Sequence, residues 1–136
     1  METIRVEVVA AEGIAWEGEA QSVIARTTEG DVGIMAKHEP FLAALVPCAA
    51  EVLTEDGRRE IVAVDGGFIS VADNRVSLLA GYARVAGEID QAAAERELAA
   101  LEKQIEGSEV DDETRARFHR AQAQVKAAQL AASEHR

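Results

Sequence analysis

The chain has 136 residues and a formal net charge of −11 at pH 7, with 48% hydrophobic and 4% aromatic residues. This length fits one domain, or a small domain with an appendage. The negative charge repels nucleic-acid phosphates and anionic lipid, and few aromatic rings are present for base stacking. We therefore expect no nucleic-acid partner and no direct insertion into lipid.

The sequence also indicates the compartment. A single cysteine, Cys48, excludes an internal disulfide and a cysteine-rich zinc site, which suits a reducing environment. No apolar run approaches the length of a membrane span, and the N-terminal residues lack the pattern of a secretory signal. We expect the protein to stay on the side of the membrane where it is made.

The composition changes abruptly near Gly87. Residues 1–86 hold 18 Val and Ile residues and both prolines, whereas residues 87–136 hold four Val and Ile residues, 12 alanines and no proline. β-branched residues with frequent glycine favour short strands, and an alanine- and glutamate-rich tract favours helix. The prediction is an α+β protein with an all-β domain over residues 1–86 and a helical arm over residues 87–136.

Within the β domain, apolar and polar residues alternate over residues 4–8, which predicts a half-buried strand. The pairs Asp56-Gly57 and Asp73-Asn74 separate apolar runs and predict two hairpins. Two prolines bracket residues 41–46, so this stretch is predicted as a loop or an edge strand. Many short strands with regular turns are typical of a small β-sandwich or a flattened barrel.

The arm is predicted as an antiparallel two-helix hairpin. The first helix starts after Asp90 as N-cap and ends at Gly107-Ser108, while acids at residues 111–113 favour the start of the second. Each helix carries one apolar stripe at helical spacing. The first stripe is Ala94, Leu98, Leu101 and Ile105; the second is Phe118, Ala121, Val125, Ala128 and Ala132.

Two properties of the arm leave its position open. Its stripes offer few large apolar side chains, so the arm must lean on the sandwich, on a partner, or alternate between them. Residues 88–113 carry ten acids and two bases, whereas residues 115–133 carry no acid and four bases, namely Arg115, Arg117, Arg120 and Lys126. Either the two helices attract each other, or the basic helix leaves to engage an acidic partner surface.

Catalytic and metal-binding patterns are missing. His38-Glu39 lacks the second histidine of a zinc-protease helix, and the three histidines suggest no metal cluster. No phosphate-binding loop is found, and Asp65-Gly66-Gly67 lacks the dinucleotide spacing, so these glycines are predicted to allow a turn or a close approach. These patterns predict no metal site and no cofactor, and they point to no active site.

Two strings in the β domain are much more specific. Residues 30–45 read GDVGIMAKHEPFLAAL and residues 64–71 read VDGGFISV, and both resemble signatures of the epsilon subunit of F-type ATP synthases. The resemblance extends over nearly the whole chain. It implies a sandwich of about ten strands and a two-helix hairpin. It also implies a non-catalytic rotor subunit that couples proton flow to ATP synthesis at the cytoplasmic face of the cell membrane.

The resemblance further implies partners and site residues. Glu29, Gly30 and Asp31 match the loop that faces the c-ring, and His38, Glu39, Pro40, Phe41 and Leu42 match the region adjoining the gamma subunit. In many bacterial relatives the arm extends along gamma, inhibits ATP hydrolysis and contacts the alpha and beta subunits. In those relatives a basic face of the arm meets the beta subunit. This chain matches that face in its positive charge but not residue for residue, through Arg115, Arg117, Arg120 and Lys126.

The same comparison implies weak or absent ATP binding by the arm. Relatives that bind ATP there begin the first helix with Ile or Leu, Asp, two variable residues, Arg and Ala, whereas this chain has Ala93 at the arginine position. A methyl group offers phosphate neither charge nor hydrogen-bond donors. Two alternatives to the rotor subunit stay open: a free-standing nucleotide-sensing module and an enzyme with an unrecognised site.

Overall fold

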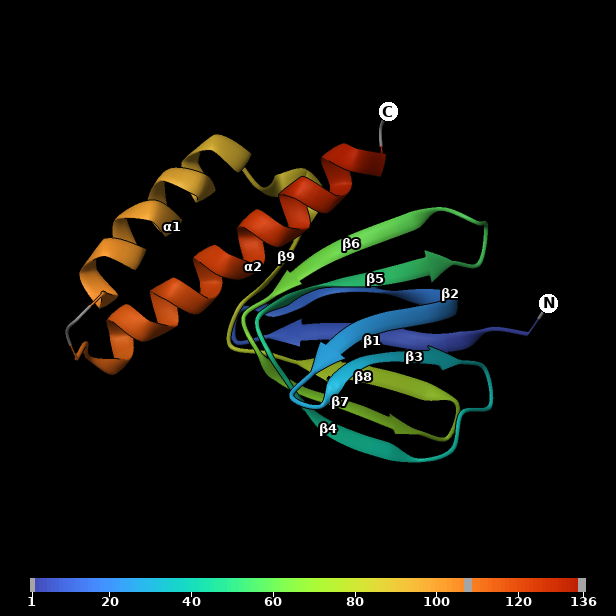
Figure 1. Ribbon diagram of the computed structural model, residues 1–136. Helices are drawn as coiled ribbons and strands as arrows, with labels where there is room; N and C mark the ends of the chain where they lie inside the picture. The colour runs from blue at the N-terminus through green and yellow to red at the C-terminus, as the bar shows by residue number, and fades with distance from the viewer. Residues whose placement is uncertain (1, 107–108, 135–136) are drawn as a thin grey trace.

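The computed structural model describes residues 2–106 and 109–134, and its nine strands form one sheet that folds back on itself as a sandwich (Figure 1). The strands are β1 (Ile4–Ala10), β2 (Gly13–Thr27), β3 (Gly30–Met35), β4 (Phe41–Leu45), β5 (Cys48–Thr54), β6 (Arg59–Val64), β7 (Gly67–Ala72), β8 (Arg75–Leu79) and β9 (Ala83–Val85). A short 3-10 turn, Ala86–Glu88, leads to α1 (Gln91–Ile105) and α2 (Asp112–Glu134). The predicted fold class is confirmed, with nine strands against about ten expected.

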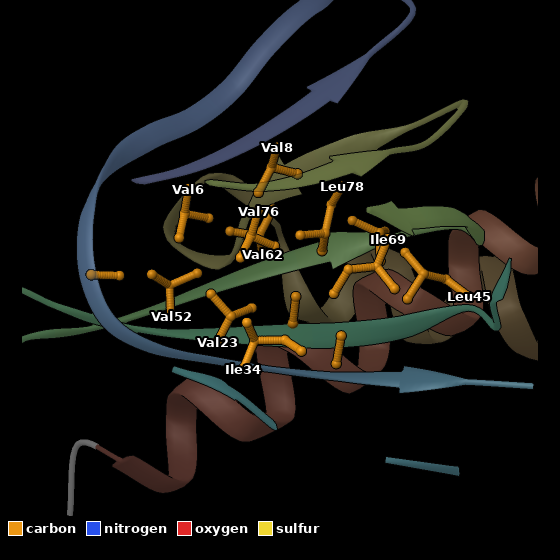
Figure 2. Packing of buried hydrophobic residues seen from close by; sticks show 14 of the residues in the cluster. Val6, Val8, Val23, Ile34, Leu45, Val52, Val62, Ile69, Val76 and Leu78 are labelled. Carbon is orange, nitrogen blue, oxygen red and sulfur yellow. The ribbon is translucent and has the colours of Figure 1, made fainter. Parts of the chain in front are cut away.

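The long strand β2 connects the two layers of the sandwich. Its first half pairs antiparallel with β1, and its second half pairs with β3 and β5. From β1 the sheet continues through β8 and β7 to β4, and from β5 it continues through β6 to β9. Aliphatic side chains from both layers, such as Val6, Val23, Val52, Ile69 and Leu78, are fully buried between them (Figure 2).

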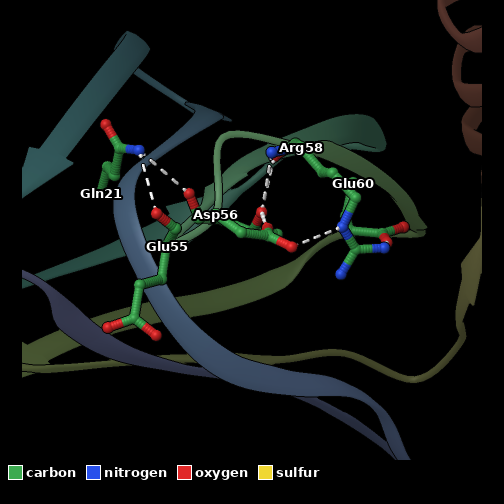
Figure 3. Close-up of polar contacts among 6 residues, drawn as sticks. Gln21, Glu55, Asp56, Arg58 and Glu60 are labelled. Atoms are coloured by element: carbon green, nitrogen blue, oxygen red, sulfur yellow. Dashed lines mark hydrogen bonds and ion pairs between the residues drawn. The ribbon is translucent and has the colours of Figure 1, made fainter.

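Both predicted hairpins form. Asp73 and Asn74 connect β7 to β8 with positive φ angles of 52° and 58°, the geometry that a tight two-residue hairpin requires. The β5–β6 turn at Asp56-Gly57 is fixed by the Arg58–Asp56 ion pair at 3.0 Å. Gln21 of β2 also donates to the carbonyl oxygens of Thr54 and Glu55 (Figure 3). These contacts tie the turn to the neighbouring strand.

The segment between the prolines is an edge strand over most of its length. β4 pairs with β7 at five positions, from Phe41 to Leu45, but with β2 only at Leu45. Of the two predicted alternatives, a loop or an edge strand, the edge strand is confirmed. Because most of the other side of β4 is unpaired, a proline on either flank is tolerated.

The second helix packs on two sides. Ala121, Val125 and Ala128 of the predicted stripe are buried, and α1 packs against α2 (Figure 1). A different face of α2 carries Ala123 and Ala127, which are completely buried. They pack against the sandwich side, on Ile61, Ala63 and Ala86. Of the three positions left open for the arm, the structure shows the arm leaning on the sandwich.

The helix ends agree with the prediction where the structure describes them. Asp90 caps α1 by accepting a hydrogen bond from the Ala93 amide at 3.1 Å, and α1 ends at Ile105. Asp111 accepts from the Thr114 amide at 2.8 Å at the start of α2, and hydrogen bonding by the Thr114 side chain and amide lowers the pKa of the Asp111 carboxyl. The predicted Gly107-Ser108 break lies outside the described residues. Ala132, predicted in the second stripe, is exposed.

We predict that residues 1–86 fold without the arm. Their large core is made of sandwich residues alone, whereas the smaller cluster under α2 adds mostly alanines. A fragment ending at residue 86 is expected to unfold cooperatively in denaturant, with a midpoint close to that of the full chain. An insoluble fragment, or one that unfolds without a cooperative transition, would contradict this division of the chain.

A second prediction concerns Gly67, which has a φ of +99°. A Cβ atom there would overlap the backbone carbonyl of Leu79 on the paired strand. We expect Gly67→Ala to lower the free energy of unfolding by about 2 kcal/mol or more in urea titrations. The matched control is Gly33→Ala, because a Cβ on Gly33 meets no atom within 4 Å. Equal effects of the two variants would refute the argument.

Candidate functional site

The turn between β2 and β3 holds Glu29, Gly30 and Asp31 in a defined shape. The buried Thr27 hydroxyl donates to the Gly30 carbonyl at 2.8 Å and accepts from the Glu29 amide at 3.1 Å. Gly30 has a φ of +113°, in the region that favours glycine. The Arg26 guanidinium, 2.9 Å from Asp31, lowers the pKa of that carboxyl through its hydrogen bond and its charge. This turn projects polar groups into solvent.

The loop that carries His38 is fixed at the other end of β3. The Lys37 amide donates to the Asn74 side chain at 2.7 Å, and the Lys37 ammonium pairs with Glu2 at 2.7 Å. The His38 ring meets Phe41 edge to face, with centroids 5.9 Å apart. Asn74 also donates to the Thr3 carbonyl at 2.9 Å, so one turn residue ties this loop to the N-terminal strand.

The two predicted sets do not form one site. Glu29, Gly30 and Asp31 lie at the start of β3, whereas His38, Glu39 and Pro40 follow its end, so the length of the strand separates them (Figure 1). In the second set, Phe41 is partly buried against the core. Leu42 instead points outward and is 72% exposed.

Leu42 adjoins a row of apolar side chains that the sequence analysis did not identify. Five residues on five neighbouring strands are direct cross-strand partners of one another. From β2 to β4 they are Ile14, Val9, Leu79, Phe68 and Ala44, and we call them the apolar row. Ile14, Leu79 and Phe68 are 57%, 48% and 54% exposed. The signal was present as apolar pairs such as Val8-Val9 and Leu78-Leu79, where one residue must face outward.

Three of the four predicted basic residues on α2 have partners inside the molecule. Arg117 pairs with Glu97 of α1 at 2.6 Å, which is the attraction between helices that the charge pattern allowed. Arg120 lies over the Tyr82 ring at 5.1 Å, and the Lys126 ammonium donates to the Pro47 carbonyl at 3.1 Å. Arg115 is exposed in the first turns of α2.

Tyr82 is a contact residue between the sandwich and α2 that sequence reasoning also missed. Its hydroxyl accepts from the Gln124 side chain at 2.8 Å, and its backbone is held by Asp65, whose carboxylate accepts from the Tyr82 amide at 3.0 Å. The turn at Asp65-Gly66-Gly67 thus positions the tyrosine that receives α2. No sequence pattern indicated this, because the contact joins residues 42 positions apart.

The surroundings of Ala93 agree with the expectation of weak ATP binding. A groove of about 370 Å³ lies beside Asp90 and Ala93, and its charged lining also includes Glu88, Glu97 and Arg84. Three carboxylates against one guanidinium would repel a triphosphate. Weak ATP binding remains a prediction.

Within residues 2–106 and 109–134, no group of three or more His, Cys, Asp or Glu side chains is placed to hold a metal ion. In the same part of the chain, no helix is both long and apolar enough to cross a bilayer.

Comparison with known proteins identifies the family. Residues 3–86 match the family described as the ATP synthase delta/epsilon chain, beta-sandwich domain. The ATP synthase epsilon chain of Cutibacterium acnes is 45% identical over 96% of this chain and 95% of its own length. That of Streptomyces avermitilis is 52% identical over 70% of this chain and 77% of its own length. The chain belongs to the ATP synthase epsilon chain family.

Solved structures share the fold. A chain in the Euglena gracilis mitochondrial ATP synthase matches 96% of this chain and 81% of its own length, with a TM-score of 0.74 and 23% identity. Membership of the epsilon chain family makes this protein a non-catalytic subunit of the ATP synthase central stalk. It belongs to a membrane-associated complex, and the free-standing sensing module and the enzyme are set aside.

We predict that the Tyr82 hydroxyl holds α2 on the sandwich. Removing one hydrogen bond costs about 1 kcal/mol, so Tyr82→Phe is expected to speed hydrogen exchange of the α2 amides several-fold. Tyr82→Ala also removes the ring under Arg120 and is expected to have a larger effect. Combining Tyr82→Phe with Gln124→Ala gives the control, because coupled partners show less than additive effects. If the effects of Tyr82→Phe and Gln124→Ala on hydrogen exchange were strictly additive, the two side chains would not be in energetic contact.

Proposed function

We propose that this chain connects the gamma subunit to the c-ring and couples proton flow to ATP synthesis by turning with them. The observation that supports this most strongly is the apolar row, with Leu42 beside it, on the outer face of one sandwich layer. A row of apolar side chains across five strands, with Ile14, Phe68 and Leu79 exposed, is typical of a protein interface. The proposed occupant is gamma.

The apolar row refines the roles of the residues assigned to the gamma-facing region. Leu42 points outward and supplies direct contact area, while Phe41 packs inward and braces the His38 ring. His38, Glu39 and Pro40 form the loop at the border of the same surface. In this proposal Phe68 and Leu79 lie at its centre and contribute more contact than the loop does.

The turn with Glu29, Gly30 and Asp31 is proposed to face the c-ring. Its shape is fixed by Thr27 and Gly30, and its charged groups remain in solvent, where a polar partner loop can reach them. A peripheral position on the cytoplasmic face of the cell membrane follows from this arrangement.

The arm is proposed to extend toward the alpha and beta subunits and to inhibit ATP hydrolysis. Arg115 is available to an acidic surface while the arm is docked, whereas Arg117, Arg120 and Lys126 must first leave Glu97, Tyr82 and Pro47. Reversing these three charges would change docking as well as partner binding, so only Arg115 gives a clean test.

We expect Leu42→Ser and Phe68→Ser each to weaken binding to purified gamma by about ten-fold, because burying such a side chain contributes about 1.5–3 kcal/mol. Isothermal titration calorimetry measures this. The matched control is Met35→Ser, since Met35 is 65% exposed but lies on β3, outside the apolar row. If all three variants bound gamma like the unchanged chain, the proposed gamma-facing surface would be wrong.

For the arm, we expect Arg115→Glu to raise ATP hydrolysis by the reconstituted synthase about two- to five-fold, the range for one exposed ion pair. Assembly is expected to be unchanged. Arg96→Glu on α1 makes the same charge change at another exposed position and serves as the control. If the Arg115→Glu variant hydrolysed ATP no faster than the Arg96→Glu variant, contact between Arg115 and an acidic partner would be contradicted.

A further inference from the structure

A groove of about 520 Å³ lies between the c-ring-facing turn and the docked arm. Arg26 and Asp31 line one side, and Lys126, Gln129 and Leu130 of α2 line the other. We propose that the docked arm forms part of the surface that binds the c-ring, so that arm docking and c-ring binding strengthen each other. This inference rests on the proposed function, because the c-ring-facing turn is one side of the groove.

The sandwich side of the groove is available for binding. Arg26 and Asp31 pair with each other at 2.9 Å, yet their side chains are 58% and 62% exposed. Each group therefore has hydrogen-bonding capacity left for a polar partner. A polypeptide that contacts Asp31 therefore also contacts the lining of the groove.

The arm side of the groove is held in place by contacts to the sandwich. The Lys126 ammonium donates to the Pro47 carbonyl at 3.1 Å. Pro47 directly precedes Cys48, which also lines the groove. Leu130 packs with the cluster formed by Ile61, Ala63 and α2. When α2 leaves, this side of the groove leaves with it, and the turn at Asp31 then stands alone.

The floor indicates the chemistry of the occupant. Ile24 is 39% exposed, and Ala49 lies beside it in the groove lining. Charged groups therefore surround an apolar strip. This pattern fits a polar loop with an apolar side chain at its tip, and in this proposal that loop belongs to a c-ring subunit.

The thermodynamic consequence is reciprocal. If the c-ring binds the docked form more tightly than the extended form, it stabilises docking by the same factor. A subunit seated on the c-ring would then extend its arm less readily than the same subunit bound to gamma alone. The arm's position thus reports whether the rotor is complete.

The experiment uses the full chain and a gamma–c-ring complex in lipid nanodiscs. The test variant is the double change Lys126→Ala with Gln129→Ala. The matched control is Lys103→Ala with Gln104→Ala, the same residue types at exposed positions on α1. We expect the test variant to bind gamma–c-ring about five-fold more weakly than the control, and to bind gamma alone equally well. In the unchanged chain, α2 amides are expected to exchange hydrogen more slowly on gamma–c-ring than on gamma alone.

The outcomes separate the two proposals. If the unchanged chain binds gamma–c-ring no better than it binds gamma alone, the c-ring-facing turn itself is wrong. If the c-ring improves binding equally for the test and control variants, and α2 exchange is the same on both complexes, the inference about the arm is overturned and the turn stands.

Discussion

The rest of the structure depends on the continuous pairing of strand β2. Its 15 residues pair with β1 along the first half and with β3 and β5 along the second, and the register shifts between Ala20 and Ser22 where it passes between layers. Ile14 at its start belongs to the apolar row, and its last residue, Thr27, holds the turn at Asp31. The two proposed interfaces therefore lie at opposite ends of one strand, which is paired with β1 in its first half and with β3 and β5 in its second.

The arm is attached by a different principle. Alanines at the contact allow α2 to lie close to β6, but each alanine buries little apolar surface, so the hydrophobic contribution per residue is small. Specific polar contacts from Gln124, Arg120 and Lys126 supply the rest. The sandwich has a large core that is mainly Val, Ile and Leu, whereas the contact under α2 is a small cluster rich in alanine. The small contact under α2 is compatible with reversible docking of the arm, whereas the sandwich core is not compatible with reversible separation of its layers.

Local pattern was enough to predict the two-part fold, both hairpins, the edge strand and the Asp90 cap, because each depends on residues close in sequence. The sandwich-facing side of α2 was missed because Ala123 and Ala127 carry almost no hydrophobic signal, although both are fully buried. The apolar row was missed because it exists only once five strands are in register. Tyr82 was missed for the same reason, since Asp65 and Gln124 reach it from distant parts of the chain. The signature strings, by contrast, identified the family.

The positions of the basic residues set the balance between docking and extension. Arg120 and Lys126 leave partners on the sandwich side when α2 moves away, and Arg117 must release Glu97 of α1 before it engages another carboxylate. An acidic surface on another subunit must therefore replace those contacts before it contributes any net attraction. Exposed ion pairs contribute little individually, and Arg117–Glu97 is half exposed, which keeps this cost small. Because leaving the docked position costs little free energy, a modest additional interaction decides whether the arm is docked or extended. A c-ring loop in the groove beside Lys126 would be such an interaction, and it would favour docking wherever the rotor is complete.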